Sequence, residues 1–196
     1  MRKTFLPLIL GSLLTFAVSC GNNQNDSTDA AKEQNEQKRD SNTATGTALA
    51  DSTKSDQNFL VEAASGGLME VELGRVAQTN ASSAKVKEFG QRMVTDHTKA
   101  NDELKAVAAS KNITIPTTPG EDQQKHIDEL KGKKGADFDK AYMSMMVDDH
   151  NEDVSAFDKE ANNGNDPDIK AFAAKTLPVL KEHLQMAKTT NDGLKK

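Results

Sequence analysis

Residues 83–111 read SAKVKEFGQRMVTDHTKANDELKAVAASK, and this stretch decides the fold class. Apolar or small residues and one histidine recur in it every three or four positions. The members of this stripe are Val86, Gly90, Met93, His97, Ala100, Leu104 and Val107. The spacing matches the 3.6 residues per turn of an α-helix that turns one face inward. It predicts a long amphipathic helix.

Three other segments show the same period, at about 57–79, 137–162 and 166–192, and a weaker helix is expected at 121–131. Short turns join the first long helix to the second and the third to the fourth. Residues 112–136 separate the second from the third, which lets these two run parallel, as in ferritin-like bundles. We therefore expect residues 57–196 to form an all-α domain, a ferritin-like four-helix bundle of two antiparallel hairpins joined by a long crossover.

The N-terminal segment has the pattern of a secretory signal. Arg2 and Lys3 precede an uncharged run, 5–18, that is too short to span a bilayer as a helix. Small residues then surround Cys20, the only cysteine, and this arrangement resembles the bacterial lipobox. The resemblance implies a signal peptide at 1–19 and lipid attachment at Cys20. It also implies an outer-membrane lipoprotein of the bacterial cell envelope, with its domain in the periplasm or at the cell surface.

The segment 20–56 joins the lipidated cysteine to the helical domain. Its only apolar residue larger than alanine is Leu49. Such a composition buries too little apolar surface to offset the loss of conformational entropy. We expect a disordered polar linker.

Composition excludes several classes of function. The formal net charge is -5, so the chain has no basic surplus for binding nucleic acid. Aromatic residues make up 4%, which disfavours a β-sandwich or barrel. A single cysteine excludes a disulfide framework and a multi-cysteine zinc site. The sequence also lacks a Gly-x-Ser-x-Gly elbow, a phosphate loop and a Rossmann fingerprint.

Several blocks of residues resemble one bacterial family, called domain of unknown function 4142. They are 59–74 (FLVEAASGGLMEVELG), 93–97 (MVTDH), 138–142 (FDKAY), 149–150 (DH) and 176–183 (TLPVLKEH). The resemblance covers nearly all of residues 57–190. It implies an exported or outer-membrane protein with a ferritin-like fold, and it leaves the activity open.

Three of the four histidines lie within the apolar stripes of three different helices. The predicted metal ligands are these histidines and two glutamates of the first helix: His97, His150, His183, Glu62 and Glu70. Inward-facing histidine and glutamate side chains build metal sites in helical bundles, and this ligand set suits zinc, iron, manganese or copper. The fourth histidine, His126, is expected to be solvated.

The same histidines have other interpretations. Buried imidazoles could instead be hydrogen-bonded to Asp96, Tyr142, Asp149 or backbone carbonyls. At 1.5 Å per residue, the helix levels put Glu62 about 5 Å and Glu70 about 8 Å from the level of His97, which does not favour a tight cage. Valine or leucine stands three residues before each histidine, where di-iron enzymes have glutamate, so a di-iron centre of that type is disfavoured.

Methionines and acidic residues near the histidines have a functional and a structural interpretation. Thioethers could bind copper, although methionine at helical spacing more often fills the core. These methionines are Met69, Met93, Met143, Met145, Met146 and Met186. The acidic residues are expected to form a solvated face. They are Asp148, Asp149, Glu152 and Asp153.

The leading hypothesis is an envelope lipoprotein that binds a divalent transition metal and is not an enzyme. Its partner would be the membrane, through the lipid anchor. A metal-free structural or partner-binding module that engages an envelope protein is the alternative, and a metal-dependent redox enzyme is the third.

Overall fold

The computed structural model describes residues 26–42 and 47–195, and in this part of the chain the regular secondary structure is helical throughout. Its elements are α1 (Ser27–Asn42), α2 (Thr47–Asn80), α3 (Ala84–Ser110), α4 (Glu121–Lys131), α5 (Gly135–Asn163) and α6 (Pro167–Leu194). No strand occurs among these residues, which hold one isolated bridge, between Ala81 and Gly135. The all-α prediction is confirmed. Residues 1–19 and Cys20 lie outside the described residues.

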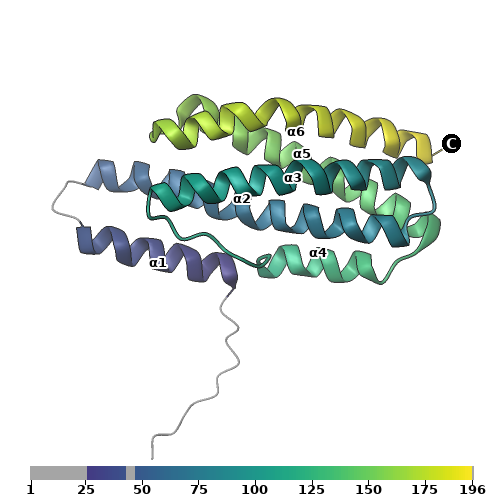
Figure 1. Cartoon of the computed structure of the whole chain (residues 1–196), viewed down its shortest axis with the longest axis horizontal. Helices are drawn as coiled ribbons and strands as arrows, with labels where there is room; N and C mark the ends of the chain where they lie inside the picture. The colour runs from purple at the N-terminus through teal and green to yellow at the C-terminus, as the bar shows by residue number, and fades with distance from the viewer. Residues whose placement is uncertain (1–25, 43–46, 196) are drawn as a thin grey trace, which may run out of the picture.

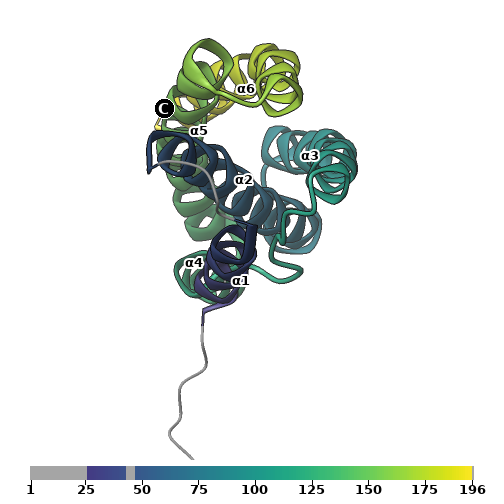
Figure 2. The same cartoon turned by 90° about the vertical axis from the view of Figure 1, so that its left-hand side faces the viewer.

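Four long helices run along a common axis (Figure 1). Helix α2 lies against α3, and α5 lies against α6; α3 also contacts α6, and α2 contacts α5. The end-on view in Figure 2 shows these helices side by side, with α1 next to α2, and with α4 next to α2 and α5. Six helices are described where the prediction named four long ones and a short one, because α1 was not foreseen.

Polar contacts place the turn between α2 and α3 beside the start of α5. The backbone N–H groups of Ser82 and Ser83 donate to the Asp139 carboxylate, at 3.1 and 2.9 Å. Asn80 donates through Nδ2 to the carbonyl oxygen of Lys133, at 2.9 Å. Helices α3 and α5 therefore begin at the same end of the molecule and run parallel. The segment predicted as a crossover, 112–136, therefore connects two parallel helices, as its length permits.

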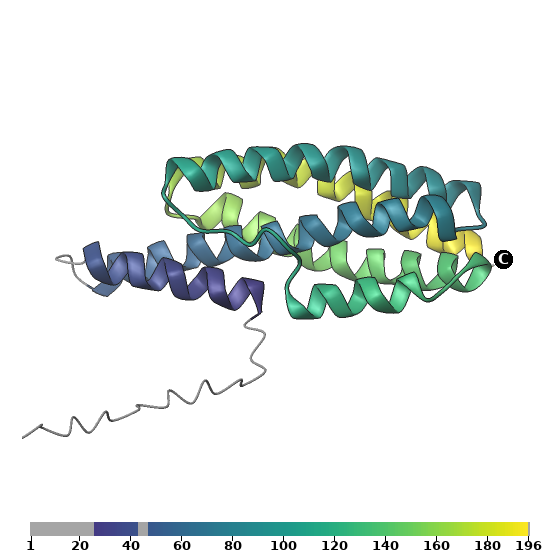
Figure 3. The same cartoon turned by 60° about the horizontal axis from the view of Figure 1, so that its bottom comes forward.

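Helix α1 lies where the sequence predicted a disordered linker, and the first residues of α2 extend into the same segment. Figure 3 shows α1 and α4 along one side of the long helices. The Asn35 side chain makes two hydrogen bonds to the backbone of Thr114. Its Nδ2 donates to the Thr114 carbonyl oxygen at 2.8 Å, and its Oδ1 accepts from the Thr114 backbone N–H at 2.7 Å. Ala31 is buried, and Lys32 forms an ion pair with Glu62. The structure thus differs from the predicted disorder over 27–42 and 47–56, because polar contacts replace the missing apolar stripe.

The core consists of two apolar clusters separated along the helix axes. The first includes Leu73, Phe89, Met143 and Ala187, and the second includes Leu60, Leu104, Phe157 and Leu180. Helices α3, α5 and α6 each place a histidine between the members of the two clusters. Helix α2 adds Glu70 beside them. A polar layer therefore divides the interior.

Candidate metal centre

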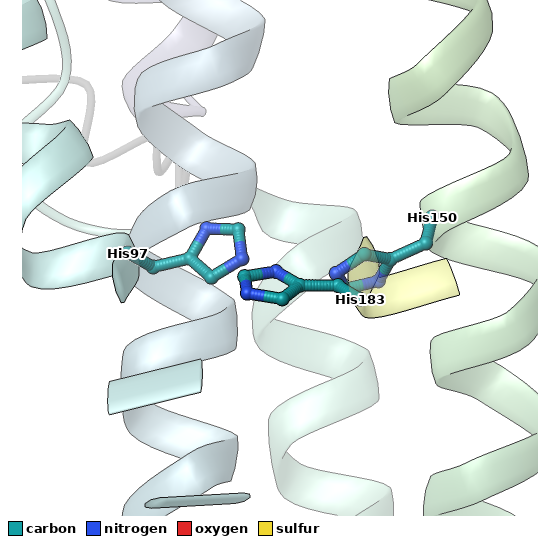
Figure 4. A group of neighbouring side chains, drawn as sticks. All are labelled: His97, His150 and His183. Atoms are coloured by element: carbon teal, nitrogen blue, oxygen red, sulfur yellow. The ribbon is translucent and has the colours of Figure 1, made fainter. Parts of the chain in front are cut away.

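Three histidines from three helices meet in this polar layer. His97, His150 and His183 are 5%, 0% and 1% exposed. Their ring centroids are 5.7 Å (His97 to His150), 5.2 Å (His97 to His183) and 5.5 Å (His150 to His183) apart. Figure 4 shows the rings directed toward one another. One ring nitrogen of each lies within 4.8 Å of the other two. An ion with bonds of about 2.0–2.1 Å holds its ligand atoms up to ~4 Å apart, so a small side-chain rotation would allow joint coordination.

The two nitrogens of each ring have different surroundings. One nitrogen of each ring has an acceptor: His97 Nδ1 lies 2.6 Å from Glu70 Oε2, His150 Nδ1 lies 3.1 Å from the Met146 carbonyl oxygen, and His183 Nε2 lies 2.9 Å from Asp96 Oδ2. The other is buried and has no hydrogen-bond partner among the described residues: His97 Nε2, His150 Nε2 and His183 Nδ1. Metal-binding histidines show this division, because the bonded nitrogen fixes the ring and leaves the other lone pair for the ion.

Glu70 completes the cluster from α2. Its side chain is buried, and Oε1 lies 3.3 Å from His150 Nε2 without the alignment of a hydrogen bond, so both atoms stay unpartnered. Burial raises the pKa of Glu70 well above its usual value and lowers the pKa of His97 to about 4. Both shifts favour the neutral forms of this pair in the metal-free protein.

The other two histidines are also held neutral. Burial lowers the pKa of His183 to about 4, and burial together with the two neighbouring imidazoles lowers the pKa of His150. Although burial alone would raise the pKa of Asp96, hydrogen bonds from Arg92 and His183 lower it. An ionised Asp96 only accepts, so His183 carries its proton on Nε2 and presents the Nδ1 lone pair to the cluster. Neutral imidazole is the form that binds metal ions.

Helix packing explains why Glu70, and not Glu62, joins the histidines. A Cβ at Gly74 would lie 2.6 Å from the carbonyl oxygen of Gly90, so α2 and α3 touch backbone to backbone at this point. That contact sets their register and brings Glu70, one turn before Gly74, to His97. The Glu62 side chain is 53% exposed and pairs with Lys32 at 2.6 Å. The structure does not place Glu62 in the cluster.

Two acidic residues that the sequence assigned to a solvated face lie in the site instead. Four ligand atoms lie within 4.8 Å of one another here: one carboxylate oxygen each from Glu70, Asp149 and Asp153, and one ring nitrogen of His150. Burial raises the pKa of both aspartates, and repulsion from Glu70 adds to it. Their neighbours Asp148 and Glu152 are exposed as expected. The spacing of four residues between Asp149 and Asp153, beside a stripe histidine, was the signal that could have revealed them.

The remaining sequence candidates lie away from the polar layer or beside it. His126 is exposed on α4. Four of the methionines are buried members of the first apolar cluster, and the other two are partly buried against it. Tyr142 is fully buried in the same cluster, and its hydroxyl has no hydrogen-bond partner among the described residues.

A small cavity adjoins the polar layer on the side of the second apolar cluster. Its volume is about 20 Å³, and Glu70, His97 and Asp153 line it together with apolar residues that include Leu104 and Phe157. A space of this size holds about one water molecule. An ion bound by the histidines would therefore have room for a solvent ligand next to it.

Fold and site define an all-helical protein with a buried histidine–carboxylate cluster at its centre. The chain belongs to the family described as Domain of unknown function (DUF4142), whose family model matches residues 40–190. This match confirms the resemblance that the sequence blocks indicated. Searches among curated proteins and among solved structures returned no match for the chain.

Proposed function

We propose that this protein is an outer-membrane lipoprotein that binds a divalent transition metal ion in a ferritin-like four-helix bundle of α2, α3, α5 and α6. The ligands would be His97, His150 and His183, with Glu70 or solvent in a fourth position. Cys20 would carry the lipid. One observation carries the metal proposal: three buried imidazoles converge, and each has a ring nitrogen without a hydrogen-bond partner among the described residues.

The energetic cost of that arrangement supports a bound ion. A buried polar atom without a partner costs about 1–3 kcal/mol, and this cluster has three such nitrogens close together. A single cation would satisfy all three at once. Imidazole ligands suit zinc, copper and iron, and manganese accepts a mixed nitrogen and oxygen set.

Metal binding is tested on the full chain, purified in mild detergent and stripped with a chelator. Zinc, copper, iron and manganese are added in turn, and bound metal and melting temperature are measured. At about a thousandfold excess over Kd, binding stabilises the native state by about 4 kcal/mol, so the melting temperature should rise. His150→Gln should abolish the rise, whereas His126→Gln, an exposed histidine on α4, should leave it unchanged.

A chain that binds none of these ions above background contradicts the metal proposal and leaves the metal-free, partner-binding module. Turnover with oxygen or peroxide in the loaded protein would instead support a redox enzyme.

The envelope location rests on the signal pattern and on Cys20. No helix in the described part of the chain is long and apolar enough to cross a membrane. Cells fed a labelled fatty acid should label the wild-type chain and not Cys20→Ser; equal labelling of both would refute the anchor.

A further inference from the structure

We propose that a second divalent cation binds beside the histidine ion, held by carboxylate oxygens of Glu70, Asp149 and Asp153. This inference rests on the proposed function, because the two ions would lie in one polar layer. The second site differs from the first in the chemistry of its ligands, which are oxygen atoms instead of imidazole nitrogens.

The geometry defines two groups of donor atoms. Glu70, Asp149, His150 and Asp153 each contribute one atom to a set whose members lie within 4.8 Å of one another. This set shares only His150 with the histidine group. Cation–oxygen bonds of about 2.0–2.6 Å, the range from magnesium to calcium, place ligand atoms up to ~4–5 Å apart, so one ion can bridge the three carboxylates after small side-chain movements.

His150 can serve only one of the two ions through its inward nitrogen. Its Nδ1 donates to the Met146 carbonyl oxygen, so Nε2 is the single free donor. We assign that nitrogen to the histidine ion. With solvent in the fourth position of the histidine ion, the three carboxylates remain as protein ligands for a separate cation, and water would complete its coordination.

Unpartnered oxygens point to a missing ligand at the carboxylates. Glu70 Oε1 and Asp149 Oδ2 are both buried and have no hydrogen-bond partner among the described residues. Glu70 is 1% exposed, so water does not take the place of that partner at the surface. The two unpartnered oxygens come from different helices, Glu70 from α2 and Asp149 from α5. Asp153 lies one turn after Asp149 on α5.

Charge gives an independent reason for a cation. Three carboxylates converge, and the charged neighbours acting on Asp153 are the acids Glu70 and Glu152. In the part of the chain that the structure describes, no lysine or arginine forms an ion pair with Asp149 or Asp153. Ionised together, the three carboxylates would repel one another, and a divalent cation between them would offset that repulsion.

The ligand types indicate which ions each site prefers. Carboxylate oxygens favour harder cations such as manganese, whereas imidazoles favour zinc. We therefore expect the full chain to hold one zinc ion at the histidines and one manganese ion at the carboxylates.

The test uses the metal-free full chain in detergent, first loaded with one equivalent of zinc. Manganese is then titrated in, and the loss of the free-ion electron paramagnetic resonance signal measures binding. The wild-type chain should take up one manganese per chain and keep its zinc. Asp153→Asn should weaken manganese binding at least about tenfold, which is ~1.4 kcal/mol, and keep zinc. Asp148→Asn, an equal charge change at an exposed neighbour, should bind like wild type.

The outcomes separate this inference from the function on which it rests. Zinc uptake without manganese uptake, up to about 1 mM manganese, overturns the second site and leaves the first. Equal losses in Asp153→Asn and Asp148→Asn also overturn it, because binding would then reflect surface charge alone. Failure to bind zinc overturns the proposed function, and the second site with it. The wild-type titration decides the matter even where Asp153→Asn does not fold.

Discussion

Acidification should destabilise the metal-free protein through its buried histidines, and His183 allows the size of this effect to be isolated. Burial lowers the pKa of His183 from 6.5 to about 4 in the folded protein. Between these two values the unfolded chain binds a proton at this position and the folded chain does not. The free energy of unfolding therefore decreases as the pH falls through this window.

The magnitude follows from the width of the window. At 1.36 kcal/mol per pH unit, the interval from pH 6.5 down to about pH 5 corresponds to about 2 kcal/mol for His183. Carboxyl groups with raised pKa values, such as Glu70, act in the opposite direction. They are present in both the wild-type chain and His183→Gln, so they cancel when the two pH dependences are compared.

The assay is urea unfolding followed by circular dichroism, at about pH 7.5 and about pH 5, with a chelator present. From the higher to the lower pH, the wild-type chain should lose about 2 kcal/mol more stability than His183→Gln. His126→Gln serves as the matched control: His126 is exposed, so this chain should show the wild-type pH dependence. Identical pH dependences of wild type and His183→Gln would refute the reasoning, because His183 would then not be held neutral by burial.

Three further variants test the packing of α2 and the docking of α1. Gly74→Ala should lower the melting temperature by forcing α2 away from Gly90, at a cost of about 1–3 kcal/mol for overpacking. Gly66→Ala has open space around the new methyl group and should raise the melting temperature through a gain of about 1 kcal/mol in helix propensity; a lower value for this variant contradicts the packing argument. Asn35→Ala removes both hydrogen bonds to Thr114 and should speed amide hydrogen exchange in α1 with little change in α5, and uniform exchange across the chain would show that α1 is not a separate unit.

The long helices were predictable because each carries an apolar stripe that repeats over many turns. The stripe of 83–111 became α3 with Val86, Met93, His97 and Leu104 buried, as its period indicates. Helix α1 has no such stripe, and it is held by Asn35 and other polar side chains on the loop after α3. Contacts of that kind depend on three-dimensional placement, so periodicity does not reveal them.

The site was predictable in part. The stripe positions of His97, His150 and His183 placed all three inside, and the structure brings them together. Levels counted from the helix turn put Glu62 closer than Glu70 to the level of His97, but rotation about the helix axis decides which glutamate faces inward. Asp149 and Asp153 were assigned to the solvated face together with their exposed neighbours Asp148 and Glu152, because composition alone does not distinguish the two faces of a helix.

The docking of α1 also sets how far the body of the protein stands from its point of attachment. The described part of the chain begins at Asp26, whose Oδ1 accepts from the backbone N–H groups of Thr28 and Glu121. With a lipid on Cys20, as we propose, only the span 20–26 would separate the acyl chains from Asp26. Even fully extended, that span reaches about 20 Å. The domain would therefore sit nearly on the bilayer surface, within reach of the headgroups, and would sweep a much smaller volume than a long tether permits.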